Sequence, residues 1–530
     1  MAAPPADRAA RRPVASLLLG LSLDRAADAP PLYQQIRDRV EAAVLGGSLG
    51  QGMRLPPERI LATALGVNRS TVMQAYQELA ASGLVEGRPG RGTVVMGPYR
   101  GPGADSPGDP SPSPDLSWLL SLPPLGQGSL GPDPSLLRDL AAISARPEII
   151  SLAAGAPGQD LIPSSAIQAA LEDGLRLRGP CALSYGPVEG HTWLRHALAE
   201  RLRGRGLPVE EDEILVLSGA TQGIALAAQS LIERGDTVVV EAPTYIGVLQ
   251  TFAAAGARLL PIPVDENGMR VDLLAPLLGR VRPRLIVVQP NLHNPTNTTM
   301  SPDRRERLLG LARRHGIPIL EDEAYAELWF HGGGPPPLKS LDRDGLVLYL
   351  GTASKTLAPG LRIGWLAASA PVVARLTLAK QFADLQSNSM AQMALCRMLM
   401  DGAYDRHLAE VRIAYRARSL ALSGAVSALP GTRIFPGSPG GFYLWCGLPL
   451  GMSSRMVTLA AARAGVAVVA GEAFYPPEGP SPADGRARLR LSWASHQPAR
   501  LVEGVARLAP ILQEATVPAG EVRISSLPVV

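Results

Sequence analysis

The sequence predicts two folded parts: a small helical domain that ends in a β-hairpin, and a large α/β domain with a smaller α+β subdomain. The first prediction rests on three helix patterns and a glycine-rich turn within residues 30–96. The second rests on apolar runs that alternate with helical patterns from about residue 145. A length of 530 residues with 46% apolar content also favours at least two domains.

The first hundred residues contain three helix patterns in close succession. Apolar residues recur every four positions from Leu32 to Val44, and a second helix begins near Glu58. A third runs from Arg69 or Ser70 to position 81, after an asparagine that is typical of a helix start. Two β-prone pieces, 84–86 and 93–96, then flank a glycine-rich turn. We therefore expect a winged helix-turn-helix over residues 28–97.

Positive charge is concentrated in this predicted domain. Residues 1–100 contain twelve Arg and eight Asp or Glu, whereas residues 101–530 carry no net charge. Such an asymmetry indicates an anionic partner for the first domain. DNA is such a partner, since the second helix of a helix-turn-helix enters its major groove. The alternative, a solvated arginine face, explains less well why helices, turn and wing occur together. The residues expected to contact DNA are Arg59, Arg69, Ser70, Thr71, Gln74 and Arg91.

The composition separates the two domains and excludes several protein classes. Residues 97–134 contain ten prolines, which predicts a linker over residues 98–140. Three scattered cysteines are too few for a disulfide framework or a zinc site, so we expect no metal. No apolar run approaches the roughly 18 residues of a membrane span. We expect a soluble, cytoplasmic protein.

Residues 141–515 have the alternating pattern of an α/β domain. Continuous apolar runs predict strands buried on both faces at 214–217, 237–241, 285–289, 317–321 and 346–350. Helical stretches at 222–234, 246–256 and 302–315 separate most of them, which favours a largely parallel sheet. A helical segment, 370–425, and β-prone pieces at 442–445, 466–469 and 488–493 favour a smaller α+β subdomain.

Chemically active residues follow several of these strands. Lys355 leaves a buried strand at the sheet edge where α/β proteins bind ligands, and a desolvated amine there can attack an aldehyde. Asp322 ends another strand, where a buried carboxylate needs a cationic partner such as a protonated pyridine nitrogen. An aldehyde and a pyridine nitrogen can belong to one cofactor with a ring and a phosphate. Its ring could be contacted by Tyr325 and Tyr245, and its phosphate could be bound at a helix start by Thr221, Thr352 and Arg362. Each also fits an ordinary structural role when taken alone.

The N-terminal motifs resemble those of the GntR family of winged-helix regulators. They are Leu55-Pro-Pro-Glu-Arg, Val67-Asn-Arg-Ser-Thr-Val and Gly90-Arg-Gly-Thr-Val. The resemblance covers residues 30–96 and implies that Arg59, Arg69, Gln74 and the wing glycines face DNA. Gln74 stands where many members have Arg, which leaves the operator sequence open.

Residues 145–510 resemble the fold-type I aminotransferases of class I and II. The motifs include Ser184-Tyr-Gly-Pro-Val-Glu-Gly, Asn294-Pro-Thr-Asn, Asp322-Glu-Ala-Tyr, Thr352-Ala-Ser-Lys and Arg488-Leu-Arg-Leu-Ser. The resemblance implies pyridoxal 5'-phosphate as cofactor, bound by Lys355 as a Schiff base. It implies that the pyridine nitrogen pairs with Asp322, the ring oxygen is contacted by Asn294 and Tyr325, and the ring face by Tyr245. The phosphate would be held by Ala220, Thr221, Thr352 and Arg362, and by Tyr185 of a neighbouring subunit. A substrate carboxylate would be bound by Arg490. One departure is Asn297, where the family usually has Gly; Asn tolerates a left-handed backbone.

The fusion of these two parts resembles the MocR subfamily of bacterial regulators. That resemblance implies a head-to-tail homodimer that binds an operator in double-stranded DNA. Its body would sense pyridoxal phosphate, or a small amine or amino-acid effector, through aldimine chemistry. Two alternatives stay open: a working aminotransferase with a secondary DNA-binding head, and a cofactor-free body that serves only for dimerisation.

Overall fold

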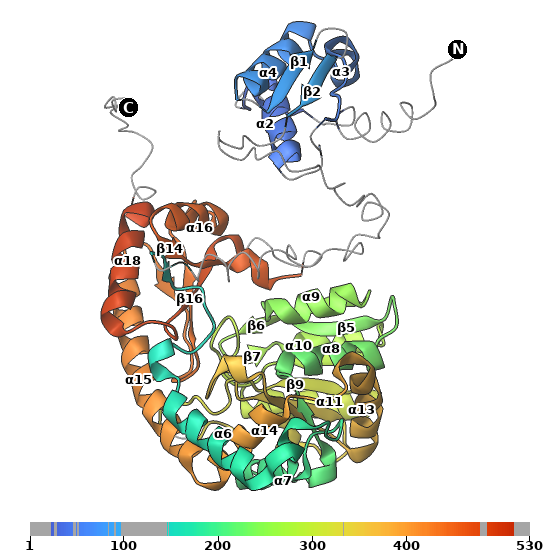
Figure 1. Ribbon diagram of the computed structural model, residues 1–530, viewed down its shortest axis with the longest axis vertical. Coiled ribbons are helices and arrows are strands. Elements are labelled where there is room, and N and C mark those ends of the chain that lie inside the picture. The colour runs from blue at the N-terminus through green and yellow to red at the C-terminus, as the bar shows by residue number, and fades with distance from the viewer. Residues whose placement is uncertain are drawn as a thin grey trace. The chain divides into compact units, whose positions relative to one another are not determined.

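The computed structural model of the chain describes residues 29–45, 52–82, 84–88, 92–96, 148–331, 333–476 and 485–513, with positions 18, 23–25, 49 and 146. Contacts within the chain separate two compact units, Met1–Ser121 and Leu122–Val530 (Figure 1). We call the first unit the head and the second the body. The predicted linker, 98–140, lies outside the described residues, and the predicted domain bounds stay predictions.

The head contains the three predicted helices and the predicted hairpin. The elements are α2 (Leu32–Leu45), α3 (Glu58–Leu65), α4 (Arg69–Ala81), β1 (Val85–Arg88) and β2 (Gly92–Val95). Gly66 ends α3 in the left-handed conformation, and the Asn68 side chain accepts a hydrogen bond from Ser70 N at 3.1 Å. Buried Ile36, Leu61 and Val72 join the helices in one core. The winged helix-turn-helix is confirmed.

The wing has a third extended segment that the sequence does not reveal. Met53 O accepts a hydrogen bond from Val95 N at 2.9 Å, and Leu55 N donates to Thr93 O at 2.9 Å. Residues 52–55 therefore run along β2 and connect the wing to the start of α3. The segment lies between glycines and a proline pair, so it shows no apolar alternation from which a strand could be predicted.

The body is built on an eight-stranded sheet with the order β4-β11-β10-β9-β8-β5-β6-β7. The bounds are β4 (Ile214–Leu217), β5 (Thr237–Ala242), β6 (Arg258–Asp265), β7 (Gly268–Met269), β8 (Leu285–Val288), β9 (Ile319–Asp322), β10 (Val347–Thr352) and β11 (Gly364–Ala367). Only β11 and the short β7 run against the other strands, which confirms a largely parallel sheet. The sequence patterns missed β6, whose two prolines argue against a strand, and the short β7 and β11.

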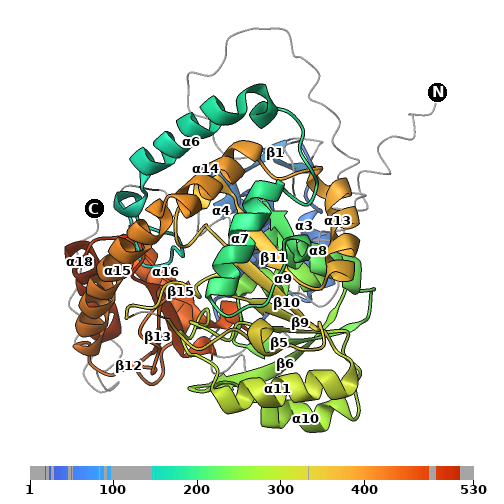
Figure 2. The ribbon, with the colours of Figure 1, turned by 90° about the horizontal axis from the view of Figure 1, so that it is seen from below.

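Helices cover both faces of this sheet. On one face lie α8 (Ala220–Leu231), α9 (Ile246–Ala254) and α13 (Ala370–Asp384); on the other lie α7 (Thr192–Gly204), α10 (Val271–Leu278) and α11 (Pro302–His315). Figure 2 shows α10 and α11 side by side along the sheet. Val238 and Val240 pack under α8 and α9, whereas Val239 packs toward α10 and α11. This alternation explains the continuous apolar runs.

The smaller subdomain is α+β, as predicted. Its antiparallel sheet contains β12 (Arg433–Ile434), β13 (Tyr443–Gly447), β16 (Arg488–Ser492) and β15 (Val469–Ala470). A further pair joins β3 (Ile150–Ser151) to β14 (Val466–Ala467). The remaining helices are α6 (Ser164–Arg178), α12 (Leu338–Leu341), α14 (Ser389–Met400), α15 (Ala403–Ser427), α16 (Ser454–Arg463) and α18 (Pro498–Gln513). Within the described ranges, every helix is too short or too polar to span a bilayer.

Candidate functional site

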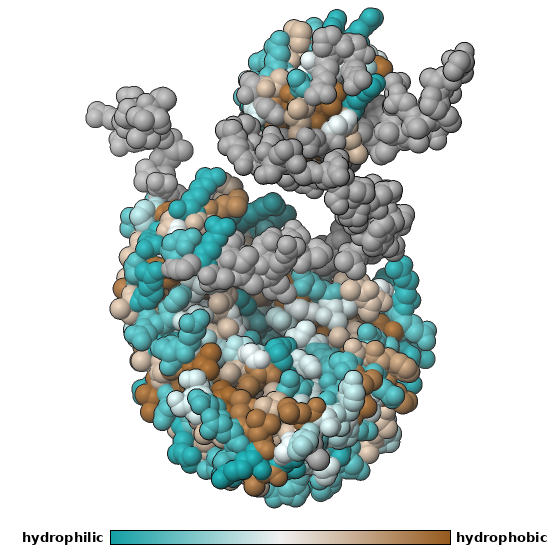
Figure 3. Space-filling view, viewed as in Figure 1, coloured by the Kyte–Doolittle hydropathy of each residue, from teal (hydrophilic) through white to brown (hydrophobic). Residues whose placement is uncertain are grey.

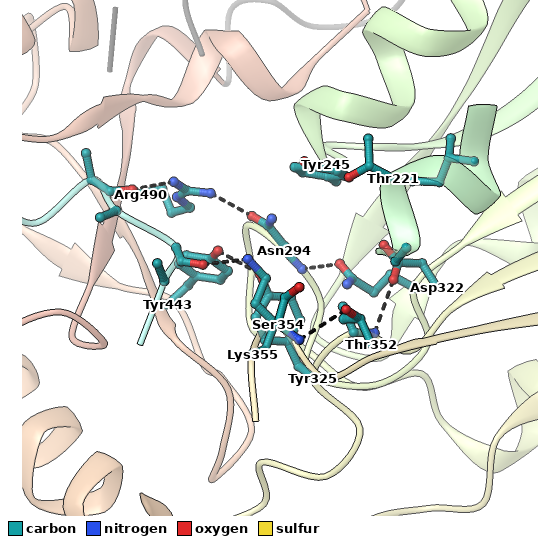
Figure 4. Close-up of a pocket in the computed structure, with 18 of the residues that line it drawn as sticks. Thr221, Tyr245, Asn294, Asp322, Tyr325, Thr352, Ser354, Lys355, Tyr443 and Arg490 are labelled. Carbon is teal, nitrogen blue, oxygen red and sulfur yellow. Dashed lines mark hydrogen bonds between the residues drawn. The ribbon is translucent and has the colours of Figure 1, made fainter. Parts of the chain in front are cut away.

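One pocket of about 350 Å³ lies where the parallel strands of the body end. Segments at the ends of β4, β5, β8, β9 and β10 supply most of its lining. The segment 153–156 after β3 (Ile150–Ser151), together with β13 and β16 of the smaller subdomain, supplies the rest. Figure 4 shows Tyr443 and Arg490 on one side of the pocket and Thr221 and Asp322 on the other. The pocket therefore belongs to both parts of the body.

Lys355 follows β10, and its amine reaches into this pocket. The Nζ atom donates a hydrogen bond to Gly155 O at 2.6 Å. Burial lowers the pKa of Lys355 to about 8, and the charges of Arg490 and Arg362 act in the same direction. The Asp322 carboxylate partly opposes them. The amine is therefore neutral, and able to act as a nucleophile, in a larger share of molecules near pH 7 than an exposed lysine is.

Asp322 is a buried carboxylate at the end of β9. Its Oδ1 accepts a hydrogen bond from Ala324 N at 3.1 Å. In the part of the chain that the structure describes, no basic side chain forms an ion pair with it. Burial raises the pKa of Asp322 to about 6, although the Ala324 N–H and the charge of Lys355 lower it. A buried acid in this situation fits a cationic ligand atom, such as a protonated pyridine nitrogen.

The start of α8 forms a concave basic corner of the pocket with Arg362. Gly219 precedes the helix with φ of 96° and provides no side-chain cap, and Ala220 and Thr221 of the first turn line the pocket. A Cβ atom at Gly219 would lie 2.5 Å from Nη2 of Arg362. That guanidinium donates to Ser218 O at 2.9 Å. Glycine thus allows an arginine to lie against a helix N-terminus, an arrangement that suits a phosphate group.

Three tyrosines line the pocket. Tyr325 OH and Tyr443 OH are 2.7 Å apart and hydrogen bonded. Burial raises the pKa of Tyr325 well above its ordinary value, and Tyr443 adds to this effect, so the phenol stays protonated. Tyr245 is hydrogen bonded to Thr221 at the opposite side. These side chains offer hydroxyl groups and aromatic faces to a flat polar ring.

Arg490, on β16, brings a buried guanidinium to the pocket. Its Nη1 donates to Asn294 Oδ1 at 3.0 Å, and its Nη2 donates to Ala153 O at 2.7 Å. The guanidinium carbon lies 4.3 Å from the ring centre of Tyr443. Nε has no hydrogen-bond partner, and no carboxylate pairs with Arg490 in the described residues. A buried cation with neutral partners fits an incoming carboxylate.

In the head, most of the predicted DNA-contacting side chains are accessible. Arg59, Arg69 and Gln74 are exposed, Thr71 is half-buried, and Ser70 Oγ donates to Asn68 Oδ1 at 3.0 Å. Arg69 also pairs with Glu58 at 3.0 Å while 62% of its side chain stays exposed. An exposed pair contributes less than about 1 kcal/mol, so a phosphate can compete for Arg69. Arg91 lies outside the described residues.

Comparisons with known proteins agree with both parts. Residues 32–95 match the family described as bacterial regulatory proteins, gntR family, and residues 147–508 match aminotransferase class I and II. The chain is 31% identical to the HTH-type transcriptional regulator TauR of Rhodobacter capsulatus, over 91% of this chain and 96% of that protein. It is 32% identical to the probable rhizopine catabolism regulatory protein MocR of Rhizobium meliloti, over 75% of this chain and 77% of that protein. The chain belongs to the MocR subfamily of GntR-type regulators.

A solved structure confirms the fold of the MocR-type body. The kynurenine aminotransferase of Pyrococcus horikoshii matches with a TM-score of 0.68 and 33% identity, over 73% of this chain and 96% of that one. That structure is a complex with PMP, the amine form of the cofactor. Class I and II aminotransferases depend on pyridoxal phosphate. The protein is therefore a GntR DNA-binding domain fused to an aminotransferase-like domain of a pyridoxal-phosphate-dependent family.

The structure brings nearly all the predicted body residues together. The predicted residues that line this pocket are Ala220, Thr221, Tyr245, Asn294, Asp322, Tyr325, Thr352, Lys355, Arg362 and Arg490. Tyr185 lies outside it and is 85% exposed. Sequence reasoning did not name Ala153–Ala156, Ile224, Gln289, Ala324, Ser354 and Tyr443 as site residues. Of these, Gln289 ends a predicted strand and Ser354 directly precedes the lysine, so both carried a signal. The individual roles of the predicted residues stay predictions.

Proposed function

We propose that this MocR-type protein is a pyridoxal-phosphate-dependent transcriptional regulator that binds a small amine or amino acid in its body. One observation carries the proposal. Lys355, Asp322 and Arg490 converge on a single pocket in a chain that also contains a DNA-binding head. An amine, a buried acid and a free guanidinium suit a cofactor aldehyde, its ring nitrogen and an effector carboxylate, respectively.

The pocket residues fit the cofactor group by group. When bound, pyridoxal phosphate supplies an electrophilic aldehyde and an electron-withdrawing ring. Lys355 would bind the aldehyde carbon, and Asp322 would pair with the ring nitrogen. The ring oxygen would be contacted by Asn294 and Tyr325, the ring face by Tyr245, and the phosphate by Ala220, Thr221, Thr352 and Arg362.

The chain's own groups also suit an amino-acid effector. An amino acid arrives as an ammonium ion, and its amine would displace Lys355 from the aldehyde carbon. The released Lys355 amine, with a pKa of about 8, can then hold the proton that the effector brought. Arg490 would bind the carboxylate while Asn294 and Ala153 O keep its guanidinium in place. Regulation requires that the effector binds two states of the protein with different affinities, and the linker would transmit that difference to the head.

We further propose a head-to-tail homodimer with shared sites. Tyr185 is an exposed aromatic side chain outside its own pocket, as expected of a residue that reaches the cofactor phosphate of the other protomer. Apolar side chains also gather on the body surface over α6 and α14 (Figures 1 and 3). Leu177 on α6 and Met400 on α14 are 73% and 72% exposed. A second copy of the chain would cover such a face.

Arg490→Ala is expected to weaken the response to amino acids more than tenfold, while the visible absorption of the bound cofactor persists. The reason is that the variant loses the carboxylate partner but keeps Lys355 and Asp322. The measurement is a titration of the cofactor-loaded protein with amino acids, followed by visible absorption and by fluorescence anisotropy of a DNA duplex that the protein selects from a random pool.

Arg488→Ala is the matched control for this titration. Arg488 lies on the same strand and stacks on Phe435 at 3.7 Å, outside the pocket lining. The Arg488→Ala variant should leave the response to amino acids unchanged. A full response of Arg490→Ala to amino acids would show that the effector is a simple amine or the cofactor itself.

Arg69→Ala is expected to reduce DNA affinity about tenfold, because Arg69 begins the helix that enters the major groove. Wild-type affinity should fall steeply with salt, and the slope should decrease by about one if Arg69 contacts a phosphate. The measurement is anisotropy of a selected duplex at several salt concentrations. Arg39→Ala removes the same charge from α2 and serves as the control. A salt-independent affinity, or equal losses in both variants, would contradict the assignment.

The second candidate function is a working aminotransferase. It is favoured by the complete set of pocket residues and by the similarity to the kynurenine aminotransferase. Incubation with amino donors and 2-oxo acids distinguishes the two. Multiple turnovers at ordinary enzyme rates support the aminotransferase, whereas a spectral change without turnover supports the regulator.

A further inference from the structure

Asn297 is a buried side chain next to the pocket but not in its lining. It lies in the loop 289–299, which follows β8, and only 3% of it is exposed. Its backbone is left-handed, with φ of 59°, and its N–H donates to His293 O at 2.5 Å. Asparagine accepts this conformation more readily than most residues do. The position therefore carries a polar side chain where a glycine would meet the backbone requirement.

Asn297 joins this loop to the loop 435–441 of the smaller subdomain. Its Nδ2 donates to Ser438 O at 2.9 Å, and Ser438 N donates to Asn297 O at 2.7 Å. A third bond links Ser438 Oγ to Thr299 Oγ1 at 2.7 Å. Three hydrogen bonds thus connect two loops that are about 140 residues apart in the sequence.

Two glycines in the second loop make room for the Asn297 side chain. A Cβ atom at Gly441 would lie 2.4 Å from its Oδ1, and one at Gly437 would lie 3.1 Å from its Nδ2. Gly441 also has a φ of 71°, which favours glycine. The two loops are therefore complementary in shape around one amide.

Each loop lies close in the sequence to a direct support of Arg490. Asn294, three residues before Asn297, accepts the hydrogen bond from Nη1 of Arg490. Tyr443, two residues after Gly441, lies under the same guanidinium, 4.3 Å from its carbon. The Asn297 side chain thus links the segments that carry two of the groups around the guanidinium, which Ala153 O and the ring of Phe474 also contact.

We infer that Asn297 is a positioning residue that sets how strongly the pocket prefers carboxylate-bearing effectors over plain amines. This inference rests on the proposed function, because it assumes that Arg490 binds the effector carboxylate. Asn297 acts through Asn294 and Tyr443 and touches neither cofactor nor effector. Its loss should therefore weaken the binding of the carboxylate and leave the amine chemistry at Lys355 unchanged.

The test is Asn297→Gly in the full-length, cofactor-loaded protein. Glycine keeps the left-handed backbone and the backbone hydrogen bonds but removes the amide. The probes are alanine and ethylamine, which differ by the carboxylate, and each is titrated against the visible absorption of the cofactor. The affinity ratio of alanine to ethylamine should fall about tenfold, or about 1.4 kcal/mol, because the guanidinium of Arg490 is held less well in place for the carboxylate. Ethylamine affinity and the initial spectrum should not change.

Two further variants make the result decisive. Asn297→Asp keeps the shape but places a carboxylate against Ser438 O, so it should lower the same ratio even if the glycine variant folds poorly. Equal weakening of both probes would overturn the inference, because it indicates a merely structural role. An unchanged ratio of alanine to ethylamine affinity in Asn297→Gly would also overturn the inference if Arg490→Ala loses the preference for alanine. The proposed function would then stay intact. A wild-type protein without any preference would overturn the inference and the carboxylate role proposed for Arg490.

Discussion

Lys355→Ala is expected to abolish the visible absorption of the lysine-bound cofactor and, with it, the effect of amines on DNA binding. The sequence has three lysines. Of these, Lys339 pairs with Asp342 at 3.3 Å and Lys380 with Asp384 at 2.8 Å, and only Lys355 lines the pocket. Because no other lysine lines the pocket in the described part of the chain, the loss should be complete. The measurement is an absorption spectrum, with borohydride reduction and mass spectrometry of the wild type.

The matched control is Lys339→Arg, which keeps the ion pair with Asp342 and should keep the spectrum. The reduced label should map to the peptide that contains Lys355. A label on another lysine would disprove the assignment of the nucleophile. A protein that takes up no label, yet still binds DNA as a dimer, would support the cofactor-free scaffold instead.

Asp322→Asn is expected to weaken cofactor binding about 100-fold, because it removes the buried partner of the ring nitrogen. Breaking a buried charge pair costs about 3 kcal/mol or more, which corresponds to this factor. The measurement is a titration of the stripped protein with pyridoxal phosphate. Asp303→Asn, which changes an exposed carboxylate on α11, is the control. Equal affinities of Asp322→Asn and wild type would contradict a pairing with the ring nitrogen.

The same substitution should have the opposite effect on the stability of the stripped protein. The pKa of Asp322 is about 6, above the ordinary 3.8, so the folded chain binds this proton more tightly than the unfolded chain does. The carboxylate therefore costs little at pH 4, and the cost grows to roughly 3 kcal/mol above pH 6. Denaturant unfolding should show Asp322→Asn gaining stability over wild type as pH rises from 4 to 7.

Much of the fold and most of the pocket could be predicted because they depend on local sequence. The parallel strands are short apolar runs, and a residue that follows such a run must lie at the sheet edge where ligands bind. Asp322, Lys355 and Thr221 each follow a strand in this way. The head was predictable for a similar reason, since Gly66 and Asn68 mark the turn between α3 and α4.

The parts that could not be predicted depend on contacts between distant segments. Gly155 O meets Lys355 Nζ across 200 residues, and no local pattern announces that contact. Tyr443 lies in an apolar strand of the smaller subdomain, where it looks like an ordinary core residue until the two subdomains pack. The extended segment 52–55 of the wing was missed likewise, because it becomes a strand only through its pairing with β2.

The division into two units has a practical consequence for protein engineering. Every residue of the pocket lies between positions 153 and 490, and every described helix and strand of the head ends by Val95. A chain cut between positions 97 and 147 therefore leaves both sets of residues whole. The body can be joined there to a foreign output domain, which would turn the proposed effector-binding body into a portable biosensor.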